Sequence, residues 1–269
     1  MNNFLRNRKS IRDFKKKKID KKVFEKIKSY CNELEKEDSQ DDFEFILYED
    51  GKKVFKSLDG IGGYAGVMIE SPHYIGLNIK NNKDQAIIYG AYYMEKLITE
   101  LTNLNIGSCW ISIVNVDEKI KKDLLGIEEG TMDYLLAIGN PVAKNPFIDE
   151  PFSSRVGIED IVFKDEIGKV VSVDELESRG LDDLFYYVRF APSSYNKQPW
   201  RFVLKDHKVI LLMAYSNDEE LNLADAGIIM YYFESLAKAI GINSKWELID
   251  ENNIKDEECK YKYIGEFAI

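Results

Sequence analysis

The sequence predicts an α+β protein made of two similar lobes. Stretches in which apolar residues recur at helical spacing alternate with short apolar runs typical of strands. The order of these stretches in the first half returns in the second half. With 269 residues and 45% apolar content, the chain can bury one large core or two smaller ones that share an interface. We therefore expect two α+β lobes that pack pseudo-symmetrically.

The first predicted helix follows a run of lysines. Asp20 is a good N-cap, and Val23, Phe24 and Ile27 recur behind it at helical spacing. A strand is expected next, at 43–48, where apolar residues alternate and end in the hairpin-like turn EDGKK. The further elements expected in the first half are a strand through 74–77, a helix over 83–104, a strand at 106–114, a helix over 116–126 capped by Asp117, and a strand at 133–141.

The lobe boundary is expected where the periodicity breaks. Residues 144–173 are rich in proline, serine and glycine, and neither period continues through them. The predicted division is a first lobe over 1–150, a connection over 151–173 and a second, shorter lobe over 174–269. The elements expected in the second lobe are a helix over 182–187, strands at 201–204 and 209–213, and a helix over 225–240.

Two alignments of the chain with itself support a duplication. In the first, residues 136 positions apart match: Met94, Leu97, Leu101, Leu104, Ile106, Ser108 and Trp110 with Met230, Phe233, Ala237, Ile240, Ile242, Ser244 and Trp246. In the second, residues 157 positions apart match: Phe43, Phe45, Ile46 and Leu47 with Trp200, Phe202, Val203 and Leu204. Amphipathic helices alone resemble one another by chance. The agreement of strand, helix and the I-x-S-x-W continuation favours duplication, with the longer strand-to-helix connection in the first copy.

Composition argues against several classes of function. The formal net charge is −10, so the far field repels phosphate, and neither nucleic acid nor an anionic membrane is an expected partner. The amino terminus lacks the apolar core of a signal peptide, and no apolar run approaches the length of a bilayer span, so a cytoplasmic location is expected. Three scattered cysteines and two histidines predict neither a disulfide framework nor a metal site. No GxSxG motif is present for a serine nucleophile.

The first motif that carries chemistry is RNRKSIRDF, near the amino terminus. It places Arg8, Lys9, Ser10 and Arg12 within five residues of an acidic chain. If this segment is extended, Arg8, Ser10 and Arg12 point to one face, which suits a phosphate or another anion. Short basic runs are also common as solvated arms, and composition alone favours that alternative.

The second motif is APSSYNKQPWRF, at 191–202. It places small polar groups and two prolines directly before an apolar run that is typical of a buried strand. Together with RNRKSIRDF, it resembles the flavin-dependent nitroreductase family, whose members commonly begin R-x-S-x-R-x-F and carry A-P-S-S-x-N-x-Q-P-W-x-F. The segments at 106–141 and SSRVGIEDIVF are also similar to that family. The resemblance implies a nitroreductase-like fold and an FMN cofactor.

The order of the motifs departs from the ordinary family pattern. In that pattern the P-S-S-x-N-x-Q-P-W loop follows R-x-S-x-R one helix later. Here the corresponding place reads EKEDSQDDFEF, and the loop occurs only in the second copy. Nitroreductase-like enzymes are homodimers that build each FMN site from both subunits. The resemblance therefore implies one composite site, between two lobes of one chain that mimic the family homodimer.

The resemblance assigns roles residue by residue. Arg8, Ser10 and Arg155 would bind the FMN phosphate, although Ser153 stands where the family often has a second basic residue. Arg12 would lie near the N1 and O2 edge of the flavin, and Lys9 would contribute through its backbone. The residues that would line the flavin ring are Pro192, Ser193, Ser194 and Asn196, with Ser112 and Ile113 aiming backbone N–H groups at N5 and O4 and Tyr195 on the substrate side.

The function that the resemblance implies is an NAD(P)H:acceptor oxidoreductase. NADH or NADPH would reduce the flavin, and an electron-poor small molecule such as a nitroaromatic or a quinone would then take the electrons by a ping-pong mechanism. The alternatives are a flavin-binding or flavin-sensing protein without catalysis, and a flavoenzyme of related fold that performs dehalogenation or flavin breakdown. The sequence leaves open whether the chain is a monomeric pseudo-dimer or a homodimer.

Overall fold

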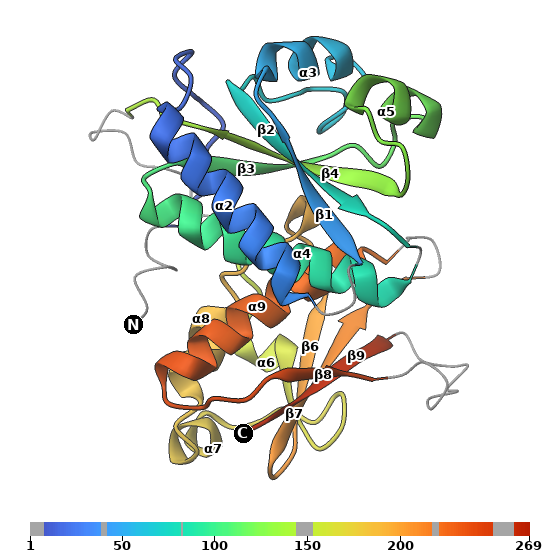
Figure 1. Cartoon of the computed structure of the whole chain (residues 1–269). Coiled ribbons are helices and arrows are strands. Elements are labelled where there is room, and N and C mark those ends of the chain that lie inside the picture. The colour runs from blue at the N-terminus through green and yellow to red at the C-terminus, as the bar shows by residue number, and fades with distance from the viewer. Residues whose placement is uncertain (1–7, 39–41, 82, 144–152, 217–220, 250–260) are drawn as a thin grey trace. The chain divides into compact units, whose positions relative to one another are not determined.

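The computed structural model describes residues 8–38, 42–81, 83–143, 153–216, 221–249 and 261–269 (Figure 1). These residues divide into two compact units, one within 6–150 and the other within 151–269. We call them the amino-terminal unit and the carboxy-terminal unit, and each contains helices packed on one mainly antiparallel sheet. Among the described residues, no helix combines the length and the apolar character that a bilayer crossing requires.

The amino-terminal unit is a four-stranded antiparallel sheet covered on both faces. The strands lie in the order β1 (Phe43–Tyr48), β2 (His73–Ile79), β4 (Thr131–Gly139) and β3 (Gly107–Ser112). The helices α2 (Lys21–Glu37) and α4 (Asp84–Asn103) pack on one face, and α3 (Gly51–Leu58) and α5 (Glu118–Leu125) pack on the other. Because both faces are covered, every residue of β2 is buried.

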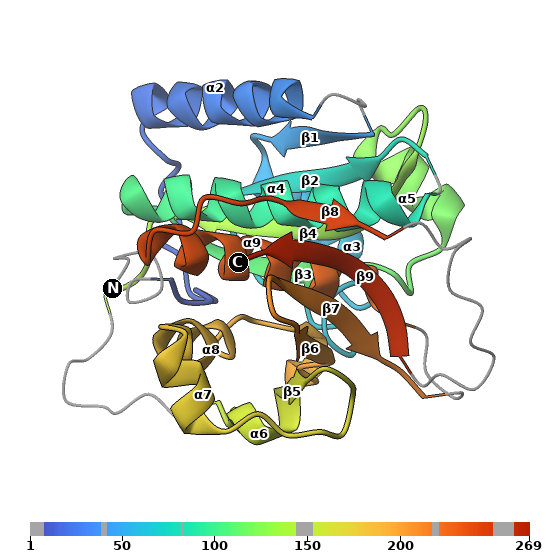
Figure 2. The same ribbon diagram turned by 90° about the horizontal axis from the view of Figure 1, so that it is seen from below.

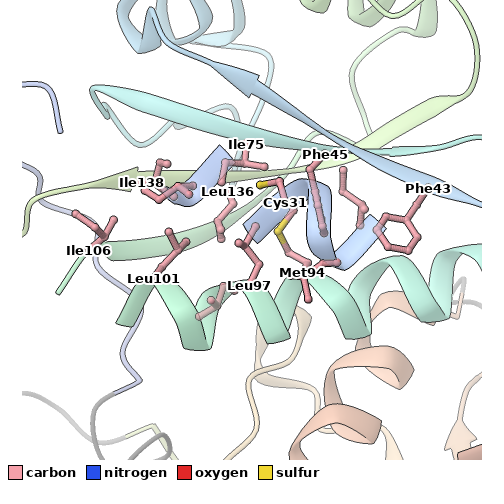
Figure 3. Close-up of a cluster of buried hydrophobic side chains, with 14 of the residues drawn as sticks. Cys31, Phe43, Phe45, Ile75, Met94, Leu97, Leu101, Ile106, Leu136 and Ile138 are labelled. Atoms are coloured by element: carbon pink, nitrogen blue, oxygen red, sulfur yellow. The ribbon is translucent and has the colours of Figure 1, made fainter. Parts of the chain in front are cut away.

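Strand alternation divides the core of this unit between the two faces. In β4, Leu136 and Ile138 join the cluster beneath α2 and α4, whereas Leu135 and Ala137 join the cluster beneath α3 and α5. Figure 3 shows Met94, Leu97 and Leu101 of α4 pointing toward β4, with Cys31 of α2 in the same cluster. Apolar side chains at helical spacing on α4 therefore fill the space above the sheet, as the sequence predicts.

The carboxy-terminal unit has a five-stranded sheet. Its strands lie in the order β5 (Val162–Lys164), β6 (Trp200–Leu204), β7 (Lys208–Ala214), β9 (Tyr261–Ala268) and β8 (Trp246–Leu248). Within this sheet, the described β5–β6 pair is parallel and the other three described strand pairs are antiparallel. Its helices are α6 (Ile158–Ile161), α7 (Val173–Ser178), α8 (Asp182–Val188), α9 (Leu223–Ala239) and the 3₁₀ turn η1 (Ser194–Asn196). Figure 2 shows β9 curving alongside β7.

Aromatic side chains fill the core between α8, α9 and this sheet. Phe233 of α9 lies at the centre, with its ring centroid 5.4 Å from that of Phe202, 5.1 Å from Trp246 and 5.1 Å from Phe267. Phe185 of α8 packs against the same ring at 5.8 Å. Offset and edge-on contacts at these distances are favourable beyond simple burial.

The two units share one topology. The order β1-β2-β4-β3 corresponds to β6-β7-β9-β8, and the long helices α4 and α9 each lie in sequence between the corresponding strands. The register corresponds as well: Trp110 pairs with Leu136 in the first sheet, and Trp246 pairs with Phe267 in the second. The register shifts by one residue at corresponding places: opposite Leu77 and Asn78 of β2, where Asp133 of β4 is the extra residue, and opposite Leu211 and Leu212 of β7, where Ile264 of β9 is the extra residue. These correspondences support the proposed duplication, which remains an inference about origin.

Several local predictions need correction. The EDGKK turn does not lead directly into a hairpin, because Asp50 caps α3 by accepting the Lys53 N–H, and β1 pairs with β2 only after that helix. The segment 144–173 was expected to lack regular structure, but its described part contains α6 and β5. The helix α7 and the strands β8 and β9 were not predicted from the sequence.

Candidate functional site

The basic motif forms an extended arm beside the edge strand β3. We call residues 8–15 the basic arm. Ser10 pairs in parallel with Ser108, the Ile11 N–H donates to the Ser108 carbonyl at 2.8 Å, and the Lys15 N–H donates to the Asn140 carbonyl at 2.8 Å. In extended backbone, alternate side chains point the same way. Arg8 Nη1 accordingly donates to Ser10 Oγ at 3.3 Å, so these two predicted phosphate ligands lie together.

Arg8 is also held by a buried carboxylate. Its Nη2 lies 2.9 Å from Oε1 of Glu95, and the same oxygen accepts a hydrogen bond from Trp110 Nε1 at 2.7 Å. The Glu95 side chain is fully buried, and only 8% of the Arg8 side chain is exposed. Glu95 therefore fixes the guanidinium in place, and it also balances part of the charge that a phosphate would meet.

The other predicted residues of this unit lie along the same edge. Lys9 and Arg12 are exposed. Burial raises the pKa of Cys109, while Arg12, Arg8 and Ser10 act in the opposite direction, so these groups lie near the same thiol. We therefore find the polar and cationic side chains of the arm gathered around the beginning of β3.

Ser112 and Ile113 lie at the other end of β3. The Ile113 N–H donates to the Asp133 carbonyl at 2.8 Å, and the Ser112 carbonyl accepts the Gly63 N–H at 2.9 Å. The Ile113 amide that was predicted to face the flavin is therefore already engaged in this structure. A flavin contact through it would require that hydrogen bond to be exchanged or shared.

The second motif forms a strained loop before β6. We call Pro192–Gln198 the serine loop. Tyr195, Asn196 and Gln198 have φ of 52°, 57° and 49°, a left-handed conformation that is uncommon for residues other than glycine. Such strain persists where the surrounding structure enforces it, and it gathers at functional sites. Two internal contacts help here: Ser193 Oγ accepts the Gln198 N–H at 2.9 Å, and the Asn196 N–H donates to the Ser193 carbonyl at 3.1 Å.

Residues 154–156 brace the serine loop from outside. Arg155 donates to Asn196 Oδ1 and to the Phe190 carbonyl, and Asn196 Nδ2 donates to the Ser154 carbonyl. The Val156 N–H donates to Gln198 Oε1 at 3.0 Å. The structure thus brings Arg155 and Asn196 together, and both ends of the Asn196 amide already have partners in the protein. Arg155 acts here as a clamp on the loop, a role that differs from the predicted phosphate contact.

A second buried carboxylate holds the serine loop from below. The Ser194 N–H donates to both carboxylate oxygens of Asp225, at 2.9 and 3.2 Å. Asp225 lies in the first turn of α9 and is 2% exposed. Burial raises its pKa to about 7, although the Ser194 amide and Lys197 each lower it in part. Tyr195, the substrate-side candidate, is 65% exposed.

Sequence reasoning missed both buried carboxylates. Glu95 follows Met94 on the buried face of α4, and Asp225 lies within the apolar run LADAGIIM. An acidic residue on an apolar helix face is rare unless it has a partner. An acidic residue within an apolar helix face could therefore have marked both positions, but it would not have shown that Glu95 contacts Arg8 or that Asp225 contacts Ser194.

The sequence also matches a known protein family. The family model described as "Putative TM nitroreductase" matches residues 2–237. The chain therefore belongs to this family. No curated protein matches the sequence.

One solved structure shows similarity in fold over the whole chain, and two others match parts of it. A putative nitroreductase from Thermotoga maritima is 16% identical with a TM-score of 0.59, and the alignment covers 100% of this chain and 93% of that one. An FMN-dependent nitroreductase from Clostridium difficile is 19% identical with a TM-score of 0.44, covering 65% of this chain and 94% of that one. A nitroreductase with bound FMN from Bacteroides fragilis is 15% identical with a TM-score of 0.45, covering 58% and 97%.

Proposed function

We propose that this protein is an FMN-dependent oxidoreductase whose single flavin site is composed of the basic arm and the serine loop. Membership of the nitroreductase family is the observation that carries this proposal. The complementary motifs support it, because each copy keeps one of the two halves that the family combines across its homodimer. In this account the two lobes replace two subunits.

The residues of the basic arm fit the phosphate end of the cofactor. Three cations lie within five residues of a chain with net charge −10, and the Ser10 hydroxyl lies beside the Arg8 guanidinium. Arg8 and Ser10 would hold the phosphate, with the guanidinium fixed in advance by Glu95. Arg12, which is exposed, would balance negative charge at the N1 and O2 edge of the flavin. Lys9 would contribute through its backbone.

The serine loop fits the ring end of the cofactor. The Ser194 N–H donates to Asp225, and Ser193 Oγ accepts the Gln198 N–H, so both groups already have partners. The Ser194 hydroxyl and Pro192 would therefore line the ring. Asn196 and Arg155 would shape this wall by bracing each other. When bound, FMN supplies hydride and electron transfer at N5, so the protein needs no acid, base or metal of its own for that step.

We further propose NADH or NADPH as the reductant and an electron-poor small molecule, such as a nitroaromatic or a quinone, as the acceptor. The two would visit one pocket in turn, in a ping-pong sequence. The exposed Tyr195 beside the serine loop would contact the acceptor. This role depends on the ring lying against that loop.

A direct experiment tests the flavin and its reduction. We expect protein purified with FMN to show the flavin absorbance bands, and NADH or NADPH to bleach them without oxygen. A colourless protein that ignores added FMN would contradict the proposal. The loss of one half-motif in each copy, together with Ser153 in place of a basic residue, favours a second candidate, a flavin-binding protein without catalysis. Bound flavin that neither nicotinamide reduces would support that candidate.

Arg8→Ala tests the phosphate contact. Loss of a charge-assisted hydrogen bond of roughly 2 kcal/mol corresponds to about thirtyfold weaker FMN binding. Riboflavin lacks the phosphate and provides the matched ligand, because its affinity should change little. A fluorescence titration of both flavins measures this difference. Equal weakening for FMN and riboflavin would show that Arg8 acts on the fold and not on the phosphate.

A further inference from the structure

The serine loop depends on one side chain outside it. Among the described contacts, the backbone N–H of Ser194 donates to the carboxylate of Asp225. Neighbouring loop residues carry backbone strain at Tyr195, Asn196 and Gln198, so the loop needs external contacts to remain in this conformation. Asp225 supplies such a contact from a rigid position in the first turn of α9, behind the Asn222 cap.

We propose that Asp225 is a positioning residue for the serine loop. The neutral carboxyl group of Asp225 holds the loop closed, and the ionised carboxylate loosens it. The proposal rests on the proposed function for its ligand, because the loop is the wall expected to receive the flavin ring. Its geometric basis is independent of any ligand. It consists of a carboxyl group that is 2% exposed and that contacts the loop backbone at 2.9 and 3.2 Å.

The direction of the effect follows from burial. A carboxylate that is removed from water is destabilised, and burial is the largest influence on Asp225. Opening of the loop would let water reach the carboxylate, so ionisation favours the open loop. The groups that act against burial are the Ser194 amide and the Lys197 ammonium, both from the loop itself. Burial outweighs them, since the pKa is raised to about 7 and not lowered.

This arrangement places the change between the ordinary range of an aspartate, about pH 4, and the raised pKa of about 7. Over this range neutral Asp225 keeps one oxygen as an acceptor for the Ser194 N–H in the closed loop, and each pH unit weakens the closed loop by up to about tenfold, because the open loop releases the proton more readily. Above pH 7 the carboxyl group is ionised in both forms, so the effect levels off. The affinity for FMN would fall over the same range, because part of the binding energy would be spent on closing the loop again.

Two variants separate the charge from the hydrogen bond. Asp225→Asn keeps an oxygen acceptor and cannot ionise, so it imitates the neutral form at every pH. Asp225→Ala removes the acceptor, so the loop should be loose at every pH. Asp183→Asn is the matched control, because Asp183 is an exposed acid in the first turn of α8 in the same unit.

The experiment is hydrogen–deuterium exchange of the peptide containing Ser194 in flavin-free protein at pH 6 and pH 8, corrected for the chemical exchange rate. Wild type and the control should lose about tenfold protection between these values. Asp225→Asn should stay protected at both, and Asp225→Ala should be unprotected at both. Exchange in β6 and β7 reports whether each variant is folded.

The outcomes decide the proposal. Equal protection of wild type and Asp225→Asn at pH 8 would overturn it, and that pair suffices even if Asp225→Ala fails to fold. Protection of a folded Asp225→Ala protein equal to that of Asp225→Asn would also overturn it. An FMN titration of the same proteins tests the proposed function separately. If the exchange follows the expected pattern but wild type binds no FMN, the role of Asp225 stands and the proposed flavin function fails.

Discussion

The two units use the same strand order but fix their motifs by different physical means. In the amino-terminal unit, the buried Glu95 on α4 holds the basic arm through an ion pair with Arg8. In the carboxy-terminal unit, the buried Asp225 on α9 holds the serine loop through a backbone amide, without an ion pair to an arginine or lysine among the described contacts. The corresponding helices thus each carry one buried carboxylate, at positions that do not match in the repeat.

The difference shows how two units of the same topology can divide one task. An ion pair presents a fixed cation and suits the binding of an anion. A carboxyl group that holds a backbone amide fixes the shape of a loop and leaves its hydroxyls available. Shared topology therefore does not require shared chemistry, and the two units can be tested against each other position by position.

The largest expected effect comes from matched core truncations. Leu97 and Phe233 occupy corresponding positions of α4 and α9, and both are fully buried. Leu97→Ala should lower the free energy of unfolding by about 2–5 kcal/mol and Phe233→Ala by about 3–5 kcal/mol, because each leaves a cavity. Hydrogen exchange should rise mainly in the sheet of the unit that carries the change. Equal loss of protection across both sheets would show that the units do not behave as separate cores.

Removal of the Glu95 carboxylate should have the next largest effect. Glu95→Ala leaves the Arg8 guanidinium and the Trp110 indole N–H without their buried acceptor, which costs roughly 3 kcal/mol. Glu95→Gln retains an oxygen for one of them and should lose about half as much. Urea unfolding measures both variants. A cost below about 0.5 kcal/mol for Glu95→Ala, typical of an exposed pair, would contradict a structural role for this contact.

Asp225 should give the stability a distinct pH dependence. Its pKa is raised to about 7 in the folded protein, so the folded protein binds this proton more tightly than the unfolded chain does. Its contribution to stability is present below about pH 4, the ordinary range of an aspartate, and is lost as the pH rises to 7. Asp225→Asn should therefore gain roughly 2 kcal/mol on wild type between pH 4 and pH 6. Parallel pH profiles for the two proteins would refute this assignment.

The smallest expected effect concerns strain in the serine loop. Tyr195 is exposed and has φ of 52°, which glycine adopts without a steric penalty. Tyr195→Gly should raise the free energy of unfolding by up to about 1 kcal/mol. Tyr186→Gly, at an exposed position of the regular helix α8, should lower it by about 1 kcal/mol. Thermal unfolding compares the two, and a loss of stability in both would argue against strain at Tyr195.

The sequence predicted the fold wherever a periodic pattern was long. The helices α2, α4, α5, α8 and α9, the strands of the first sheet, and β6 and β7 of the second sheet follow directly from apolar spacing and capping residues. The helix α3 was missed because its eight residues follow an Asp-Gly pair that also begins turns. The edge strand β8 has only three residues, too few for a period to show.

The residues proposed for the site come from motif resemblance, and their contacts with other residues were not predictable from the sequence. Motif resemblance pointed to Arg8, Ser10, Ser194 and Asn196, yet it gave no indication that Arg155 clamps Asn196 or that Glu95 pairs with Arg8. Such contacts join residues that are far apart in sequence, and only tertiary packing creates them. The alternative that composition alone favours, a solvated arm, fails for Arg8, because its side chain is largely buried.

We propose above that one FMN binds to the basic arm and to the serine loop of the same chain. A crystal structure of the protein with FMN tests this proposal most directly. We expect one flavin per chain, with its phosphate beside Arg8 and Ser10 and its ring against Pro192 and Ser194. Two flavins per chain, or a flavin whose phosphate and ring both contact a single unit, would contradict the account.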